Sequence, residues 1–284
     1  MTATKGLEGV VAAETKISSI IDDQLTYVGY DIDDLTENAS FEEVVYLLWH
    51  KQLPNRLELE DFKLQLNQNA TIPQELIDHL KSYPLDKVHP MAALRTAISY
   101  LALLDEEADV MDEEANYRKA IRLQAKIGTI VAAFARIRKG LEPIEPRKDL
   151  GYAANFLYML NGKEPDPIEE EAFNKALVLH ADHELNASTF AARVCVATLS
   201  DVYSGITTAI GTLKGPLHGG ANEQVMRMLD EIGTIDRVES YIQDKFTKKE
   251  KIMGFGHRVY RKGDPRAKHL KQMSKKLTEL TGKP

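Results

Sequence analysis

Helical periodicity is the feature of this sequence that most constrains its fold. Apolar residues recur at helical spacing along one stretch of the chain, 116–139, at Ile121, Ala125, Ile130, Phe134 and Ile137. Gly140 follows directly and suits the position just after a helix end. Ser40 and Glu43 form a capping-box pattern before a second apolar run, and Pro54 lies soon after that run. The sequence therefore predicts a mainly α-helical protein.

Most of the remaining chain carries the same signal. Further helices are expected at 57–67, 91–104 (with Pro90 at its start), 152–160, 167–180, 189–203, 221–232, 238–246 and 266–281. Strand signals are confined to residues 16–30, where Ile17 to Ile21 and Leu25 to Val28 flank Asp22 and Asp23. This pattern predicts one short N-terminal β-hairpin. Glycines and a proline between Gly211 and Gly220 mark a domain change.

The charge of the chain is unevenly distributed. The whole sequence is acidic, with a net charge of −7. The segment from Asp244 to Lys276 is the opposite, with 12 lysines and arginines against three acidic residues. An acidic body disfavours non-specific nucleic-acid binding, so we expect no nucleic-acid partner. The basic segment fits either a discrete anionic ligand or a solvated helix face.

Cysteine usage and the absence of long apolar runs indicate the compartment. Cys195 is the single cysteine, so no internal disulfide is possible and a reducing environment is expected. The first residues lack the pattern of a signal peptide. No apolar run approaches the roughly 18 residues of a membrane span. We therefore expect a cytoplasmic protein with no membrane association.

The most informative motif lies in the basic segment, at Lys251 to Arg266. It reads K-I-M-G-F-G-H-R-V-Y-R-K-G-D-P-R and places His257 after two glycines and among five cations. Glycines let backbone N–H groups approach a ligand, and arginine can fork onto a carboxylate or phosphate. A histidine in such surroundings can act on a carbonyl group that the cations have positioned.

A second motif, H-A-D-H-E-L-N-A-S-T, runs from His180 to Thr189. The spacing of His180 and His183 would let both face a metal ion on one side of a helix. Two histidines do not complete a coordination shell, and the other interpretation is a pair of helix-end residues with ordinary hydrogen bonds. We predict no metal site.

The third motif, K-G-P-L-H-G-G-A-N-E, runs from Lys214 to Glu223 and sets His218 between glycine pairs. The glycines predict that His218 precedes a helix that starts near Ala221. A helix N-terminus disfavours imidazolium, so this histidine is suited to donate a hydrogen bond while neutral. Taken alone, the motif slightly favours the other interpretation, a loop histidine in a tight turn.

Together, in this order, the three motifs resemble the citrate synthase family, and the likeness extends to the stretches G-L-E-G-V-V-A-A-E-T-K-I-S-S-I and Y-V-G-Y-D-I-D-D-L. The resemblance implies a multi-helical fold with a large and a small domain, a homodimer and an active site between the domains. It places residues 1–218 in the large domain and 219–284 in the small one. The implied reaction condenses acetyl-CoA with oxaloacetate to give citrate and CoA, without metal or cofactor.

The resemblance also assigns roles to individual residues. His218 matches the histidine that hydrogen-bonds the acetyl thioester carbonyl, and Ser188 the residue that orients it. His257 matches the histidine that polarises the oxaloacetate ketone. His183, Arg266 and Asn186 match substrate-binding residues. The loop that holds CoA corresponds to Lys251, Ile252, Met253, Gly254 and Phe255, with Arg261 and Lys262 near the CoA phosphates.

One family feature has no match in these 284 residues. The family's general base is an aspartate beyond the D-P-R triplet, and Asp264, within that triplet, does not correspond to it. The resemblance thus predicts a chain truncated at its C-terminal end, with the remainder of both domains missing. A polypeptide of these residues alone is then expected to be inactive.

Two other functions fit the motifs. A 2-methylcitrate synthase shares them and takes propionyl-CoA. A non-catalytic helical module could use the basic segment to bind CoA or a partner protein.

Overall fold

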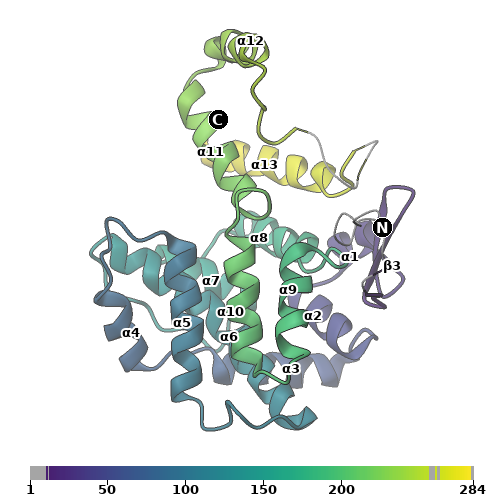
Figure 1. Cartoon of the computed structure of the whole chain (residues 1–284), viewed down its shortest axis with the longest axis vertical. Helices are drawn as coiled ribbons and strands as arrows, with labels where there is room; N and C mark the ends of the chain where they lie inside the picture. The colour runs from purple at the N-terminus through teal and green to yellow at the C-terminus, as the bar shows by residue number, and fades with distance from the viewer. Residues whose placement is uncertain (1–10, 12, 256–259, 261–262, 283–284) are drawn as a thin grey trace, which may run out of the picture.

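The computed structural model describes residues 11, 13–255, 260 and 263–282 (Figure 1). Within them lie three strands, thirteen α-helices and one short 3-10 helix. The helices are α1 (Ile32–Asn38), α2 (Phe41–His50), α3 (Arg56–Asn69), α4 (Gln74–Lys81), α5 (Pro90–Leu104), α6 (Glu113–Arg138), α7 (Tyr152–Asn161), α8 (Pro167–Leu179), α9 (Ala187–Val196), α10 (Val202–Leu213), α11 (Gly220–Ile232), α12 (Val238–Lys248) and α13 (Ala267–Thr281), with the 3-10 turn η1 at Ile235–Arg237. The prediction of a mainly α-helical fold is confirmed.

The predicted hairpin is present and forms part of a small antiparallel sheet. Strands β1 (Ser18–Ile21) and β2 (Gln24–Tyr27) pair through a turn at Asp22 and Asp23. Both turn residues have positive φ, 52° and 66°, as a two-residue hairpin turn that matches the strand twist requires. The sequence did not indicate the third strand, β3 (Tyr30–Asp31), which pairs with β2.

Local signals fixed several helix ends as expected. Ser40 and Glu43 form the predicted capping box of α2, since the Ser40 side chain accepts from the Glu43 N–H and the Glu43 carboxylate accepts from the Ser40 N–H at 2.7 Å. Pro90 begins α5. Gly140 follows the end of α6 with φ of 69°, the left-handed conformation that glycine adopts without strain.

One predicted helix, at 189–203, is wrong as a single element. The structure has α9, a break at residues 197–201 and then α10. Leu199 in the break has φ of 64°, and Asp201 caps α10 by accepting from the Ser204 N–H at 2.9 Å. The capping interaction outweighed the continuous apolar pattern. Helices α1 and α4 were also not foreseen.

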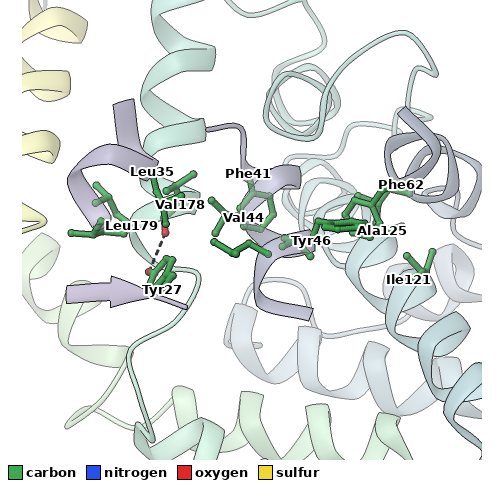
Figure 2. Packing of buried hydrophobic residues seen from close by; sticks show 14 of the residues in the cluster. Tyr27, Leu35, Phe41, Val44, Tyr46, Phe62, Ile121, Ala125, Val178 and Leu179 are labelled. Atoms are coloured by element: carbon green, nitrogen blue, oxygen red, sulfur yellow. Dashed lines mark hydrogen bonds between the residues drawn. The ribbon is translucent and has the colours of Figure 1, made fainter. Parts of the chain in front are cut away.

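Two apolar clusters form the core, and α6 contributes to both. In the first, β2, α1, α2 and α8 pack around Tyr27, Val44 and Val178 (Figure 2). Ile121 and Ala125 of α6 belong to this cluster. The next turns of α6 pack instead with α4, α5 and α10. Helix α6 is long enough to contribute to both clusters and thus joins them.

Helices α11 and α12 extend from this body at one end of the molecule (Figure 1). Ile232 is the one buried residue of α11, and α12 has none among its described residues. Helix α13, in contrast, packs against α8. The division into a large domain up to residue 218 and a small domain from 219 stays a prediction.

A polar network fastens α13 to α1 and α8. The ring of His269, which is 6% exposed, lies between two carboxylates of α1: its Nε2 is 2.7 Å from Asp33 and its Nδ1 is 3.1 Å from Glu37. An imidazole donates to both only when both nitrogens carry protons. Lys175 of α8 joins the network through its Nζ, which donates to Glu37 at 2.8 Å.

This network should support folding above acid pH. The hydrogen bond from Lys175, opposed by partial burial, lowers the pKa of Glu37 below its usual 4.5. A carboxylate whose folded pKa is lowered stabilises the fold above its unfolded pKa, and that contribution is lost as pH falls through the folded value. Glu37→Gln should therefore lower the melting temperature by about 2–4 °C at pH 7, and the difference should shrink as the pH falls below 4.5.

The matched control is Glu60→Gln, which removes a solvent-exposed pair with Arg56 on α3. Exposed pairs contribute little, so its melting temperature should move by less than about 1 °C. Equal shifts for the two variants would contradict a special role for the α1–α13 network.

Candidate active site

The structure describes part of the site that the sequence predicted. His183, Asn186, Ser188, His218, Arg266 and the loop from Lys251 to Phe255 lie within the described residues. His257, Arg261 and Lys262 lie outside them. Their assignments therefore remain predictions.

Ser188 contacts two of the predicted residues. Its hydroxyl donates to Asn186 Oδ1 at 2.7 Å, and its Oγ lies 2.9 Å from His218 Nε2. Asn186 Oδ1 also accepts from the Thr189 N–H at 3.0 Å, which makes Asn186 the N-cap of α9. A hydroxyl has one proton to give. Because the Ser188 hydroxyl directs its proton at Asn186 Oδ1, the second hydrogen bond is donated by His218 Nε2–H to Ser188 Oγ.

His218 is presented by the turn that precedes α11. Its backbone N–H donates to Gly215 O at 2.9 Å, and α11 begins two residues later at Gly220. The expectation that His218 lies just before a helix is confirmed. Its side chain reaches back to α9, so it joins two segments that are 30 residues apart in sequence.

Tyr260 contacts two of the predicted site residues, and sequence reasoning missed it. Its hydroxyl lies 2.9 Å from His183 Nε2, and the guanidinium of Arg266 lies 5.9 Å from the centre of its ring. Tyr260 is 5% exposed, and this burial raises the pKa of its hydroxyl to about 12. It therefore stays neutral and brings His183 and Arg266 to one place. The only local signal was an aromatic residue between two basic ones.

Arg266 is held in a fixed orientation by Asp264. Its Nε and Nη2 donate to the two carboxylate oxygens at 2.9 and 2.7 Å. Burial opposes the positive charge, but the hydrogen bonds and charge of Asp264 keep the pKa of Arg266 above its usual value. Two of the five guanidinium N–H groups make this pair. The other three are not used by this pair.

The loop that carries His183 is anchored to the β-sheet. The Tyr27 hydroxyl lies 3.0 Å from Asp182 O and accepts from the Asp182 N–H at 3.2 Å. Ser18 donates to the Asp182 carboxylate and accepts from the Glu184 N–H at 2.8 Å. Burial raises the pKa of both Tyr27 and Asp182. The hairpin thus positions one wall of the site.

The predicted CoA loop lies against α11. Gly254 has φ of 83°, and a Cβ built there would be 3.2 Å from Val225 of α11. Phe255 is 77% exposed. Glycine at position 254 therefore permits both the positive φ and the close approach to α11. The aromatic side chain at the end of the loop faces solvent.

The two histidines considered for a metal are engaged separately. His180 Nδ1 lies 2.6 Å from Ala176 O, whereas His183 Nε2 faces Tyr260. No group of three or more metal-ligating side chains occurs among the residues described. Over the same residues, no helix combines the length and apolar character needed to span a bilayer.

The fold and the site together define a mainly helical protein in which His183, His218 and Arg266 are each held by a side-chain hydrogen bond. A family model described as "Citrate synthase, C-terminal domain" matches residues 6–284. Citrate synthase 2 of Bacillus subtilis is 75% identical over 282 residues, which cover 99% of this chain and 76% of the relative. A 2-methylcitrate synthase of Mycobacterium tuberculosis is 47% identical over 94% of this chain and 68% of its own length.

A solved structure gives the same result. The citrate synthase of Thermoplasma acidophilum, solved in a ternary complex with carboxymethyl coenzyme A and oxaloacetate, superposes with a TM-score of 0.91 at 34% identity, over 98% of this chain and 74% of that one. The chain belongs to the citrate synthase family. Its activity is that of a citrate synthase, an acyltransferase.

The anchoring of the 180–184 loop can be tested without substrate. Tyr27→Phe leaves buried polar groups of this loop without a partner, which should cost about 1–3 kcal/mol of unfolding free energy. Amide hydrogen exchange at Asp182 should then accelerate. Tyr30→Phe in the same sheet is the control, since Tyr30 is 42% exposed. Unchanged exchange at Asp182 in Tyr27→Phe would refute the anchoring role.

Proposed function

We propose that this citrate synthase condenses acetyl-CoA with oxaloacetate and that the described residues divide the work as the family resemblance assigns. The observation that carries the proposal is the contact between Ser188 and His218. It puts a histidine in a defined orientation beside the loop that carries His183. No metal or cofactor is needed for this reaction.

His218 acts on the acetyl group. The acetyl methyl is a very weak acid, so a base can remove its proton only if a donor stabilises the carbonyl oxygen as charge develops there. A neutral imidazole has one N–H. For His218 to donate through Nδ1, its neutral ring must carry its proton on Nδ1 and not on Nε2. Exchange of the ring proton with solvent gives this tautomer. Rotation of the Ser188 hydroxyl from Asn186 to the bare Nε2, both within 2.9 Å of Ser188 Oγ, then holds it.

His183, Asn186 and Arg266 hold oxaloacetate. The substrate is a dianion, and Arg266, already oriented by Asp264, offers its remaining donors to one carboxylate. His183 follows Asp182, whose backbone is fixed by Tyr27. A rigid wall of this kind positions the ketone for attack, which is a main source of rate enhancement. His257 would polarise that ketone.

CoA binds over the loop from Lys251 to Phe255. Gly254 packs closely on α11, and the exposed Phe255 ring offers a surface on which a base can stack. Arg261 and Lys262 would meet the CoA phosphates.

We further propose a cytoplasmic homodimer. Helix α9 has no buried residue, and it carries exposed apolar side chains at Val194 (54%) and Val196 (38%), followed by Leu199 (81%). Exposed apolar surface of this kind is typical of a subunit interface. A second copy of the chain would cover it.

The second candidate is a 2-methylcitrate synthase, which the relative of that name at 47% identity keeps open. Comparison of kcat/KM for the two acyl-CoA substrates separates the candidates. We expect acetyl-CoA to be preferred by about 10-fold or more, the discrimination that one methylene permits. A preference for propionyl-CoA would reverse the assignment. Membership of an enzyme family removes the support for a non-catalytic module.

Substitution of the two proposed catalytic histidines tests the roles. His218→Ala and His257→Ala should each lower kcat by at least about 100-fold, the range for loss of an acid–base or oxyanion group. The polypeptide used must carry the family's general-base aspartate. His79→Ala on α4 is the control, and turnover unaffected in either catalytic variant would disprove its assigned role.

A further inference from the structure

Few side-chain hydrogen bonds connect helix α11 to the body of the protein. Among the described residues, two side-chain hydrogen bonds connect segment 214–255 to the rest of the chain. One is the contact of His218 with Ser188. The other joins His89, at the start of α5, to Glu223 in the first turn of α11. The first bond holds the turn that presents His218, and the second holds the helix that follows this turn.

The ring of His89 is fixed in place by its own helix. His89 is the N-cap of α5, and its Nδ1 accepts from the Met91 N–H at 3.1 Å. Pro90 follows with its restricted φ. Since Nδ1 is an acceptor, the neutral ring carries its proton on Nε2. That nitrogen lies 3.0 Å from Glu223 Oε2, so His89 donates to the carboxylate.

Glu223 receives this bond as a charged group. Its other oxygen, Oε1, accepts from Nη2 and Nε of Arg227 at 2.6 and 3.2 Å. The hydrogen bonds from Arg227, and then that from His89, lower the pKa of Glu223. The carboxylate is thus held from two sides: Arg227 is on the same helix, and His89 is on a different one.

The turn between His218 and α11 transmits movement because it has no spare room. A Cβ at Gly219 would lie 2.6 Å from the side chain of Leu213 and 2.7 Å from its backbone oxygen. A Cβ at Gly220 would lie 2.9 Å from the backbone oxygens of Lys214 and Gly215. Backbone packed this closely shifts as a unit. A displacement of the first turn of α11 therefore displaces His218, five residues before Glu223.

We propose that His89 is a positioning residue for His218. By holding Glu223, it fixes the first turn of α11 and so the distance between His218 and Ser188. The proposal rests on the catalytic role of His218 given above. Both partners are partly exposed, with side chains 34% and 40% accessible, so the bond contributes little to global stability. Its effect should appear in turnover instead.

The sharpest variant is His89→Asn. Asparagine is a good N-cap and preserves the start of α5, but its side chain is too short to reach Glu223. Glu223→Ala removes the same bond from the other side. In an active enzyme, each variant should lower kcat by about 5- to 20-fold with both KM values within about twofold, and the double variant should be no worse than the single ones. Melting temperatures should change by less than about 2 °C.

Arg227→Gln is the matched control. It removes the other partner of Glu223 and leaves the bond to His89, so kcat should stay within about twofold of the parent. Either His89→Asn or Glu223→Ala with a parental kcat would overturn the proposal. Additive losses in the double variant would also overturn it, because the two residues would then act independently.

Hydrogen exchange distinguishes failure of this proposal from failure of the proposed function. In the ligand-free 284-residue chain, His89→Asn and Glu223→Ala should both accelerate exchange of amides 219–225 by about tenfold. The first turn of α5 should be unaffected in His89→Asn. This readout does not depend on catalysis. Unchanged exchange would refute the proposal even if His218 is catalytic.

Discussion

The hydrogen bond between Ser188 and His218 is the contact on which the site depends. It joins the start of α9 to the turn before α11, and both ends are fixed by local structure. Asn186 caps α9 and accepts a hydrogen bond from the Ser188 hydroxyl. The Gly215 carbonyl accepts a hydrogen bond from the backbone N–H of His218. A histidine on a glycine turn would otherwise sample many orientations. The bond to Ser188 selects one orientation of the ring.

The rest of the body supports this contact from the N-terminal side. The segment 182–188 carries His183, Asn186 and Ser188 in sequence, and Tyr27 and Ser18 hold its first residues. Tyr27 in turn is fully buried in the core beside Val178, to which it is hydrogen-bonded (Figure 2). Packing of the small sheet against α8 thus reaches the segment that carries His183 through two hydrogen bonds.

Sequence reasoning succeeded where one local cause decides the outcome. The capping box at Ser40, the turn at Asp22 and Asp23, and the glycine after α6 each depend on residues a few positions apart. It failed at 197–201, where an apolar pattern continued across a helix break. The cap from Asp201 decided that break, and capping competes with periodicity in a way that the pattern alone does not weigh.

The same distinction between local and long-range causes applies to the residues of the candidate site. His183, His218 and Arg266 lie in recognisable motifs, and the resemblance assigned them. Tyr260 and the pair of His89 and Glu223 were missed because their contacts join residues 77 and 134 positions apart. His89 had no distinguishing neighbours in the sequence. Contacts of this range follow from the tertiary fold, which brings α5 to α11 and Tyr260 to His183.

A crystal structure of the enzyme with oxaloacetate and an unreactive acetyl-CoA analogue would test the central claim most directly. The account predicts that His218 remains bonded to Ser188 through Nε2 while Nδ1 lies within about 3 Å of the analogue's carbonyl oxygen. It also predicts Arg266 and His183 on oxaloacetate. An analogue carbonyl bound away from His218, or a His218 ring that has left Ser188, would contradict it.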